Sequence, residues 1–159
     1  GESAGGNLAL GVILSATADV SLSMPVAVAL LSPWIDLTHS GDSHTTLAGK
    51  DPTLSTHHFL EPASLAYAGD HPTSGTDISP LFAEIVEFPP ALISTATRDL
   101  LLSDSVRLAT KLRAANCQVD LRVAEGLWHV FEWYPQCPEA VESLRGIATF
   151  LKLHLESPS

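Results

Sequence analysis

The stretch Gly1-Glu2-Ser3-Ala4-Gly5-Gly6 opens the chain and is followed at once by a run of apolar residues over positions 8–18. A Gly-x-Ser-x-Gly spacing is typical of a sharp turn from a strand into a helix, which lifts the serine hydroxyl clear at the top of a sheet. In such a turn, Gly1 and Gly5 are expected to leave room where a Cβ would clash. A flexible or helix-capping glycine–serine loop is the alternative interpretation of the same residues.

The segments after this turn alternate between helix-like and strand-like patterns, which predicts a parallel sheet built from βαβ units. The predicted strands are 26–31, 90–95 and 119–124, and the predicted helices are 8–18 and 104–115. Apolar residues occur nearly all round the first helix, so we expect it to be buried. The continuous apolar run at 26–31 is typical of a parallel strand covered on both faces. The fold class predicted is α/β.

Asp99 and His129 each follow one of the predicted strands, Asp99 after 90–95 and His129 after 119–124. Parallel strands bring their carboxyl ends to one edge of the sheet, where α/β proteins place their sites. Serine, then acid, then histidine is also the chain order of α/β-hydrolases. Ser3, Asp99 and His129 are therefore the candidate nucleophile, acid and base. The alternative for His129 is a packed histidine between aromatic neighbours.

Asp104 competes with Asp99 for the role of the acid. Ser103 is predicted to be the N-cap of the helix at 104–115, which would place Asp104 in its first turn, stabilised by the helix dipole. That is a structural role, whereas Asp99 has no capping duty that the sequence reveals. Asp36 is expected to cap or brace a loop and is assigned no catalytic role.

Several blocks of the chain together resemble the hormone-sensitive-lipase-like (family IV) esterases. The blocks are Gly1-Glu2-Ser3-Ala4-Gly5-Gly6-Asn7-Leu8-Ala9, Leu31-Ser32-Pro33-Trp34-Ile35-Asp36-Leu37-Thr38, Asp77-Ile78-Ser79-Pro80-Leu81, Thr97-Arg98-Asp99-Leu100-Leu101-Leu102-Ser103-Asp104 and Glu125-Gly126-Leu127-Trp128-His129-Val130-Phe131. The resemblance implies an α/β-hydrolase fold with a helical cap and hydrolysis of short- to medium-chain carboxylic esters. It implies that Ser3 is the nucleophile, Asp99 the acid and His129 the base.

Such esterases take part of their oxyanion hole from a His-Gly-Gly-Gly-type loop upstream of the nucleophile, and no such run occurs here. We therefore interpret the chain as the C-terminal half of a longer protein and expect it to be nearly inactive alone. The backbone N–H of Ala4 is the oxyanion donor that the chain itself is predicted to supply. The predicted chemistry requires no metal or organic cofactor.

Residues 38–75 differ in composition from the rest and are predicted to be a cap segment, with 1–37 and 76–159 forming the hydrolase core. Five of the seven histidines fall in this stretch. Such a group of histidines can indicate a metal site, but no pair of them has the i, i+4 spacing of helical metal ligands. One helix is expected near 56–67. Trp128, Trp133 and Phe131 are expected to form pocket wall or core.

The predicted partner is a small ester. A net charge of −10 disfavours nucleic acid and anionic membrane surfaces. The chain has two cysteines, which agrees with a location in the reducing cytoplasm. A homodimer is also predicted. Two other functions stay open: hydrolysis of lactones, carbamates or amides by the same residues, and ligand binding without catalysis.

Overall fold

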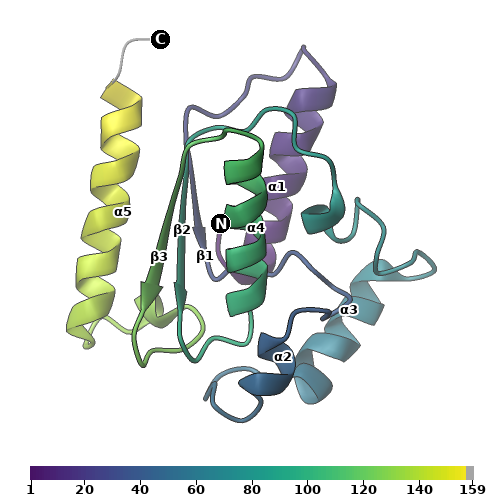
Figure 1. The fold of residues 1–159 in the computed structure, drawn as a ribbon, viewed down its shortest axis with the longest axis vertical. Helices are drawn as coiled ribbons and strands as arrows, with labels where there is room; N and C mark the ends of the chain where they lie inside the picture. Colours follow the sequence, from purple (N-terminus) through teal and green to yellow (C-terminus); the bar gives the residue numbers. More distant parts are fainter. Residues whose placement is uncertain (157–159) are drawn as a thin grey trace.

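The computed structural model describes residues 1–156 and contains a parallel sheet of three strands. The strands are ordered β1 (Val28–Leu31), β2 (Ala91–Ala96) and β3 (Val119–Ala124). In the register of the sheet, Ala91 lies opposite both Val28 and Val119. Glu2 forms a further parallel bridge with Leu31, so the residues before Ser3 run beside β1. All three arrows point the same way in Figure 1, which places their carboxyl ends at one edge.

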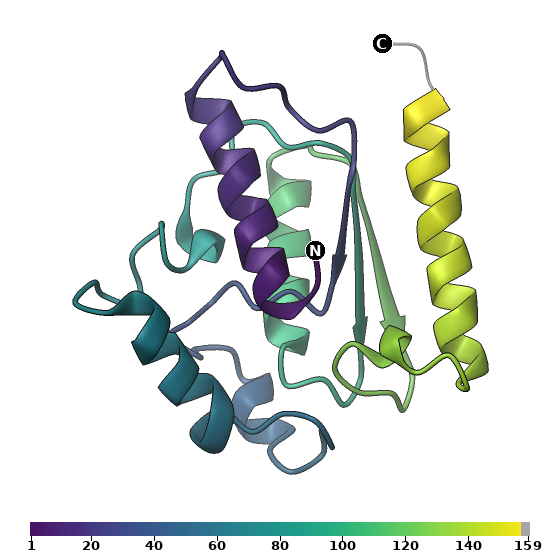
Figure 2. The ribbon, with the colours of Figure 1, turned by 180° about the vertical axis from the view of Figure 1, so that it is seen from behind.

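Helices cover both faces of this sheet. Figures 1 and 2 show α1 (Ser3–Ala18) and α4 (Leu102–Ala114) on one face and α5 (Pro138–Glu156) on the other. The first face holds the largest apolar cluster, in which Leu10, Ile93 and Leu108 are all buried. Leu92 points the other way and packs with Ile147 and Phe150 of α5. The alternation of side chains along β2 thus builds a core on each face, and the predicted α/β fold class is confirmed.

Between β1 and β2, the chain first runs beyond the carboxyl ends of the strands and then returns to their amino ends (Figure 2). It contains α2 (Ser43–Thr46), a π-helical turn at Thr56–Leu60, α3 (Glu61–Ala68) and a 3₁₀ turn at Pro80–Phe82. Trp34, Leu60 and Leu101 belong to one apolar cluster beneath these elements. The segment is therefore packed onto the loops that follow β1 and β2, while the domain boundary at residues 38–75 stays a prediction.

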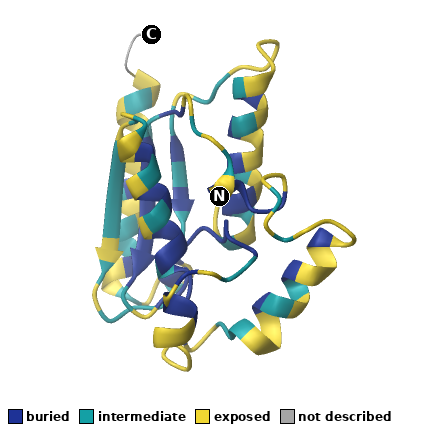
Figure 3. Ribbon diagram, turned by 45° about the vertical axis from the view of Figure 1, so that its right-hand side comes forward, coloured by how far each residue is buried: buried dark blue, intermediate teal, exposed yellow. Residues whose placement is uncertain are grey.

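Most predicted elements agree with the structure within two residues, but the expectation that the first helix is buried was wrong. The first helix starts at Ser3 and is not buried all round, because Leu8 and Val12 are 59% and 61% exposed. Figure 3 shows this division of buried and exposed residues along the helices. The amphipathic helix α5 had not been predicted. None of the helices within residues 1–156 is long and apolar enough to cross a membrane.

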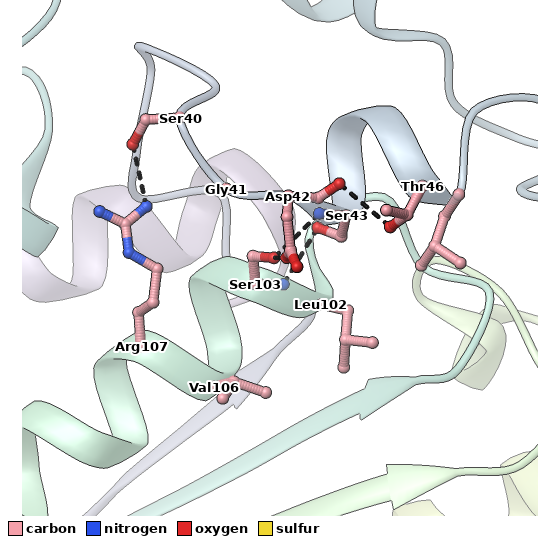
Figure 4. Close-up of a pocket in the computed structure, with 10 residues that line it drawn as sticks. Ser40, Gly41, Asp42, Ser43, Thr46, Leu102, Ser103, Val106 and Arg107 are labelled. Atoms are coloured by element: carbon pink, nitrogen blue, oxygen red, sulfur yellow. Dashed lines mark hydrogen bonds between the residues drawn. The ribbon is translucent and has the colours of Figure 1, made fainter.

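Ser103 is not the N-cap of α4, contrary to expectation, because that helix begins one residue earlier, at Leu102. Ser103 instead joins α4 to α2 (Figure 4). Its hydroxyl donates to Asp42 at 2.7 Å and accepts from the Ser43 backbone N–H at 3.1 Å, and its own N–H donates to the Ser43 hydroxyl. Gly41 permits this approach, since a Cβ there would lie 2.5 Å from the Ser103 Cβ.

Candidate active site

Ser3 occupies the turn that the opening motif predicted. The N–H of Leu31 donates to the carbonyl of Gly1, and the N–H of Trp34 donates to the carbonyl of Ser3. Between these two anchors, Ser3 has a φ of 47°, in the left-handed region that residues with a Cβ seldom adopt. Helix α1 begins at the same residue. A strained serine between an extended segment and a helix is the geometry of a nucleophile elbow.

Gly1 and Gly6, not Gly5, leave the space that this turn needs. A Cβ on Gly1 would clash with the carbonyl oxygen of Gly5, and a Cβ on Gly6 would lie 2.7 Å from the Pro33 Cβ. A Cβ on Gly5 would meet nothing within 4 Å. The expectation that Gly5 relieves a steric clash was therefore wrong for this structure. Gly6 has that role because α1 packs directly against the loop that follows β1.

We expect Gly6→Ala to lower the free energy of unfolding by about 1–3 kcal/mol, since the new methyl group must displace Pro33. The matched control is Gly11→Ala in the same helix, where a Cβ would meet nothing within 4 Å. That substitution should stabilise the chain by up to about 1 kcal/mol, because alanine favours helix. Urea unfolding of both variants gives the comparison, and equal effects would contradict the packing argument.

Asp99 and His129 form a buried pair at the carboxyl end of the sheet. The Nδ1 atom of His129 lies 3.1 Å from Oδ1 of Asp99, and the side chains are 8% and 0% exposed. Thr95 Oγ1 donates to the other carboxylate oxygen at 2.9 Å, and the Leu101 N–H donates to Oδ1 at 2.9 Å. Asp99 is therefore held by two elements, the end of β2 and the start of α4.

These contacts decide the charge of Asp99. Burial alone would raise the pKa of its carboxyl, because the charged form loses its hydration. Hydrogen bonds from His129, Ser32 and the Leu101 backbone, with the attraction of the imidazolium, outweigh burial and hold the pKa below its ordinary value. The carboxylate is thus ionised at neutral pH and can orient the imidazole through Nδ1.

Ser3 and His129 line one cavity of about 260 Å³. Thr53, Leu54 and Phe59 form another part of its lining, and Val130, Trp133 and Tyr134 complete it. The structure therefore brings the three candidate residues to one place: Ser3 and His129 share a cavity, and Asp99 lies behind His129. A serine, a histidine and a buried carboxylate so arranged can carry out nucleophilic catalysis.

Ala4, the predicted oxyanion donor, is the second residue of α1. Backbone N–H groups in the first turn of a helix have no acceptor within that helix. They also lie at the positive end of the helix dipole, where negative charge is favoured. The Ala4 N–H is thus free of helical pairing beside the Ser3 hydroxyl.

Of the three aromatic residues expected in the pocket wall or the core, Trp128 and Phe131 lie outside the lining of the Ser3 cavity. Phe131 is 2% exposed and packs in the core with Ala96 and Ala140. Trp128 is half-buried and contacts the ring of Tyr134, which does line the cavity. Trp133, the third, lines the cavity with Phe59 and Tyr134, and its indole N–H donates to Glu2 at 3.4 Å.

Ser32 contributes to the site but was not singled out from the sequence. It follows β1, is fully buried and has a φ of 47°. Its hydroxyl bonds the Asp99 carboxylate and accepts from the Val130 N–H at 3.1 Å. Val130 also has a positive φ, of 45°. Ser32 therefore ties the acid to the residue after His129, and only its place at a predicted strand end could have drawn attention to it.

Asp104 and Asp36 are structural, as expected, although Asp104 acts through different contacts. Oδ2 of Asp104 accepts from the N–H groups of Ile35 and Asp36, both at 2.9 Å. Asp36 accepts in turn from Thr38, Ser40 and Arg107. Asp104 thus fixes the loop after β1 to α4, and Asp36 braces the same loop from inside.

Asp104 should make the unfolding free energy depend on pH. Burial, opposed by the two backbone hydrogen bonds, raises the pKa of this carboxyl from 3.8 to about 7. A raised pKa means that the native state binds the proton more tightly, so the contribution is full below pH 4 and is lost as the pH rises to 7. The loss is at most about 4 kcal/mol.

We expect Asp104→Asn to become more stable relative to the wild type as the pH rises from 4 to 8, because asparagine mimics the protonated acid. Burial also lowers the pKa of His44 to about 4, which gives the opposite slope in part of this range. Both proteins contain His44, so its contribution cancels when the stability of the wild type is subtracted from that of the variant. Thermal melts across the pH range measure it, and a constant difference would contradict the assignment.

The histidines of residues 38–75 do not converge on one point. His39 stacks on Trp34 and contacts the edge of His44, whereas His57 pairs with Glu61 on the surface. Within residues 1–156, no group of three or more histidine, cysteine or acidic side chains is arranged to hold a metal ion.

Residues 1–133 match the model of a protein family described as alpha/beta hydrolase fold, so the chain belongs to that family. An esterase of Acinetobacter venetianus is 32% identical over 96% of this chain and 52% of its own length. An acetyl-hydrolase of Streptomyces hygroscopicus is 31% identical over 96% of this chain and 50% of its own length. The chain spans about half the length of these curated relatives.

Solved structures extend the likeness to three dimensions. A hormone-sensitive lipase from a metagenome library superimposes with a TM-score of 0.92 and 33% identity, over 97% of this chain and 53% of that one. Esterase E25 gives a TM-score of 0.90 and 34% identity, over 95% and 46%. The resemblance to hormone-sensitive-lipase-like esterases seen in the sequence is therefore confirmed.

Proposed function

We propose that the protein is a carboxylic ester hydrolase in which Ser3, His129 and Asp99 form the catalytic triad. The observation that carries this proposal is the Asp99–His129 pair beside a cavity that Ser3 also lines. The esterase and acetyl-hydrolase names of the relatives support the ester as substrate class. Short- to medium-chain acyl esters are the substrates we propose.

In the proposed reaction, the Ser3 hydroxyl oxygen attacks the ester carbonyl while His129 takes up the hydroxyl proton. Asp99 holds the imidazole through Nδ1 and stabilises the positive charge that forms on the ring. The Ala4 N–H donates to the oxyanion of the tetrahedral intermediate. His129 then gives its proton to the leaving alcohol. Water next attacks the acyl-enzyme carbonyl while His129 takes up a proton from it, and that proton passes to the Ser3 oxygen as the carboxylic acid leaves.

A chain with one oxyanion donor should react slowly, since losing one such donor typically lowers the rate by about 10²–10³-fold. We therefore propose that this chain alone is nearly inactive and gains activity when completed. The completed protein, as used below, is this chain joined to the upstream half of the Acinetobacter venetianus esterase.

A fluorophosphonate probe tests the proposal, because it labels only a serine that a base has activated. We expect labelling of the completed protein, weak labelling of the chain alone and none in either Ser3→Ala variant. Circular dichroism establishes that each protein is folded. A folded, completed protein that does not label would favour the alternative of ligand binding without catalysis, whereas strong labelling of the chain alone would contradict only its predicted weak activity.

A further inference from the structure

Asp51 is a buried carboxylate for which the reaction described above has no use. It lies between α2 and the π-helical turn at Thr56–Leu60, inside the predicted cap segment, and is only 6% exposed. A buried carboxylate is costly unless donors surround it. The position of its hydrogen bonds therefore shows what it holds together.

One oxygen of Asp51 spans the two loops that carry the acid and the base. Oδ2 accepts from the backbone N–H of Leu100 and from that of His129, each at 3.3 Å. Leu100 directly follows Asp99. The same oxygen thus contacts the main chain beside both members of the Asp99–His129 pair. Leu100 and His129 are 49 and 78 positions from Asp51 in the sequence.

The other oxygen of Asp51 holds the cavity wall. Oδ1 accepts from the Thr53 N–H at 2.8 Å, from the Thr53 hydroxyl at 2.7 Å and from the Leu54 N–H at 3.2 Å. Thr53 and Leu54 line the cavity together with Ser3 and His129. The two oxygens therefore join a wall of the cavity to the loops of the acid and the base.

We propose that Asp51 is a positioning residue, which holds the His129 main chain and the Asp99 loop in a fixed relation to the Thr53–Leu54 wall. This inference rests on the proposed esterase function. A carboxylate side chain suits the role because donors face both of its oxygens. Its five donors come from three separate parts of the chain, so no local contact could replace it.

Asp51→Asn is the most informative substitution, because it preserves the shape of the side chain. An amide has one acceptor oxygen, and its NH₂ group would face N–H donors on one side or the other. Either the triad loops or the cavity wall then lose their acceptor. Small misplacements of catalytic groups have large effects on rate, reaching about 100-fold for 1 Å.

In the completed protein we expect Asp51→Asn to lower kcat by about 10–100-fold, with KM changed less than about threefold. The rate is expressed per active site titrated with the fluorophosphonate, so misfolded molecules do not count. Asp70→Asn, at an exposed aspartate after α3, is the matched control and should leave kcat unchanged. An unchanged kcat per titrated site in Asp51→Asn would overturn the proposal.

Amide hydrogen exchange provides a second readout that needs no activity. In Asp51→Asn, segments containing Leu100 or His129 should exchange at least about tenfold faster, since a lost hydrogen bond eases local opening. Exchange in β2 should not change. If Asp51→Asn does not fold, Thr53→Val tests the proposal in its place. It removes only the hydrogen bond from the Thr53 hydroxyl to Asp51, and we expect a smaller fall in kcat per titrated site. If the wild-type amides of Leu100 and His129 exchange slowly but the completed protein does not turn over an ester, the esterase function is refuted and the positioning role stands. If exchange at these amides is unchanged in Asp51→Asn, the positioning role is refuted.

Discussion

Replacing Ser3 with alanine should lower kcat of the completed protein on a p-nitrophenyl butyrate ester by about 10⁵–10⁶-fold, the effect of removing a triad nucleophile in other serine hydrolases. The reason is that the covalent route disappears and only transition-state binding remains. The strained φ of 47° at Ser3 is a property of the backbone, and alanine keeps the Cβ. Folding should therefore change little.

Ser15→Ala is the control for this experiment, since Ser15 lies in the same helix and is exposed. It should retain wild-type kcat and wild-type labelling by the fluorophosphonate. Steady-state kinetics with active-site titration separates loss of chemistry from loss of folded protein. Turnover that survives in Ser3→Ala would assign the nucleophile to another residue and refute the proposed triad.

The second large effect is expected at the acid, where Asp99→Asn should lower kcat by about 10³–10⁴-fold. The Thr95 hydroxyl and the Leu101 N–H both donate to the carboxylate. Asparagine has a single acceptor oxygen, which the Leu101 N–H and His129 already share in the carboxylate, and it carries no charge. The imidazole therefore loses the negative charge that fixes its tautomer and stabilises its protonated form. Substrate binding should change little, because Asp99 is fully buried behind the histidine.

Asp104→Asn is the matched control, because Asp104 is equally buried and lies five residues further along the chain. Its contacts are the backbone N–H groups of Ile35 and Asp36. We expect kcat within about threefold of the wild type and a change in the pH dependence of stability instead. A larger loss of kcat in Asp104→Asn than in Asp99→Asn would exchange the roles of the two aspartates.

The candidate site was largely predictable because its residues follow strands in a parallel sheet. Once the strands at 90–95 and 119–124 are recognised, Asp99 and His129 must lie at the same edge as the turn at Ser3. The competing acid, Asp104, was also given its structural role from the helix that contains it. These predictions depend on local pattern and chain order, which a sequence contains.

The residues that were missed act through contacts across the chain. Ser32 reaches Asp99 and Val130, and Asp51 reaches Leu100 and His129, all over long sequence separations. Gly6 was passed over in favour of Gly5 because nothing in the motif shows that Pro33 packs against α1. Phe131 was expected in the pocket wall or the core, and only its neighbours Ala96 and Ala140, from two other elements, place it in the core.

The sequence by itself determined the α/β class, the elbow at Ser3 and the identity of the candidate acid and base, because hydrophobic periodicity and motif spacing are local properties of the chain. Only the tertiary structure decided which glycine is needed for packing, which aromatic ring lines the cavity and which buried polar groups hold the triad loops. Those features depend on distances between residues far apart in the chain, and such distances exist only after the helices and loops have packed.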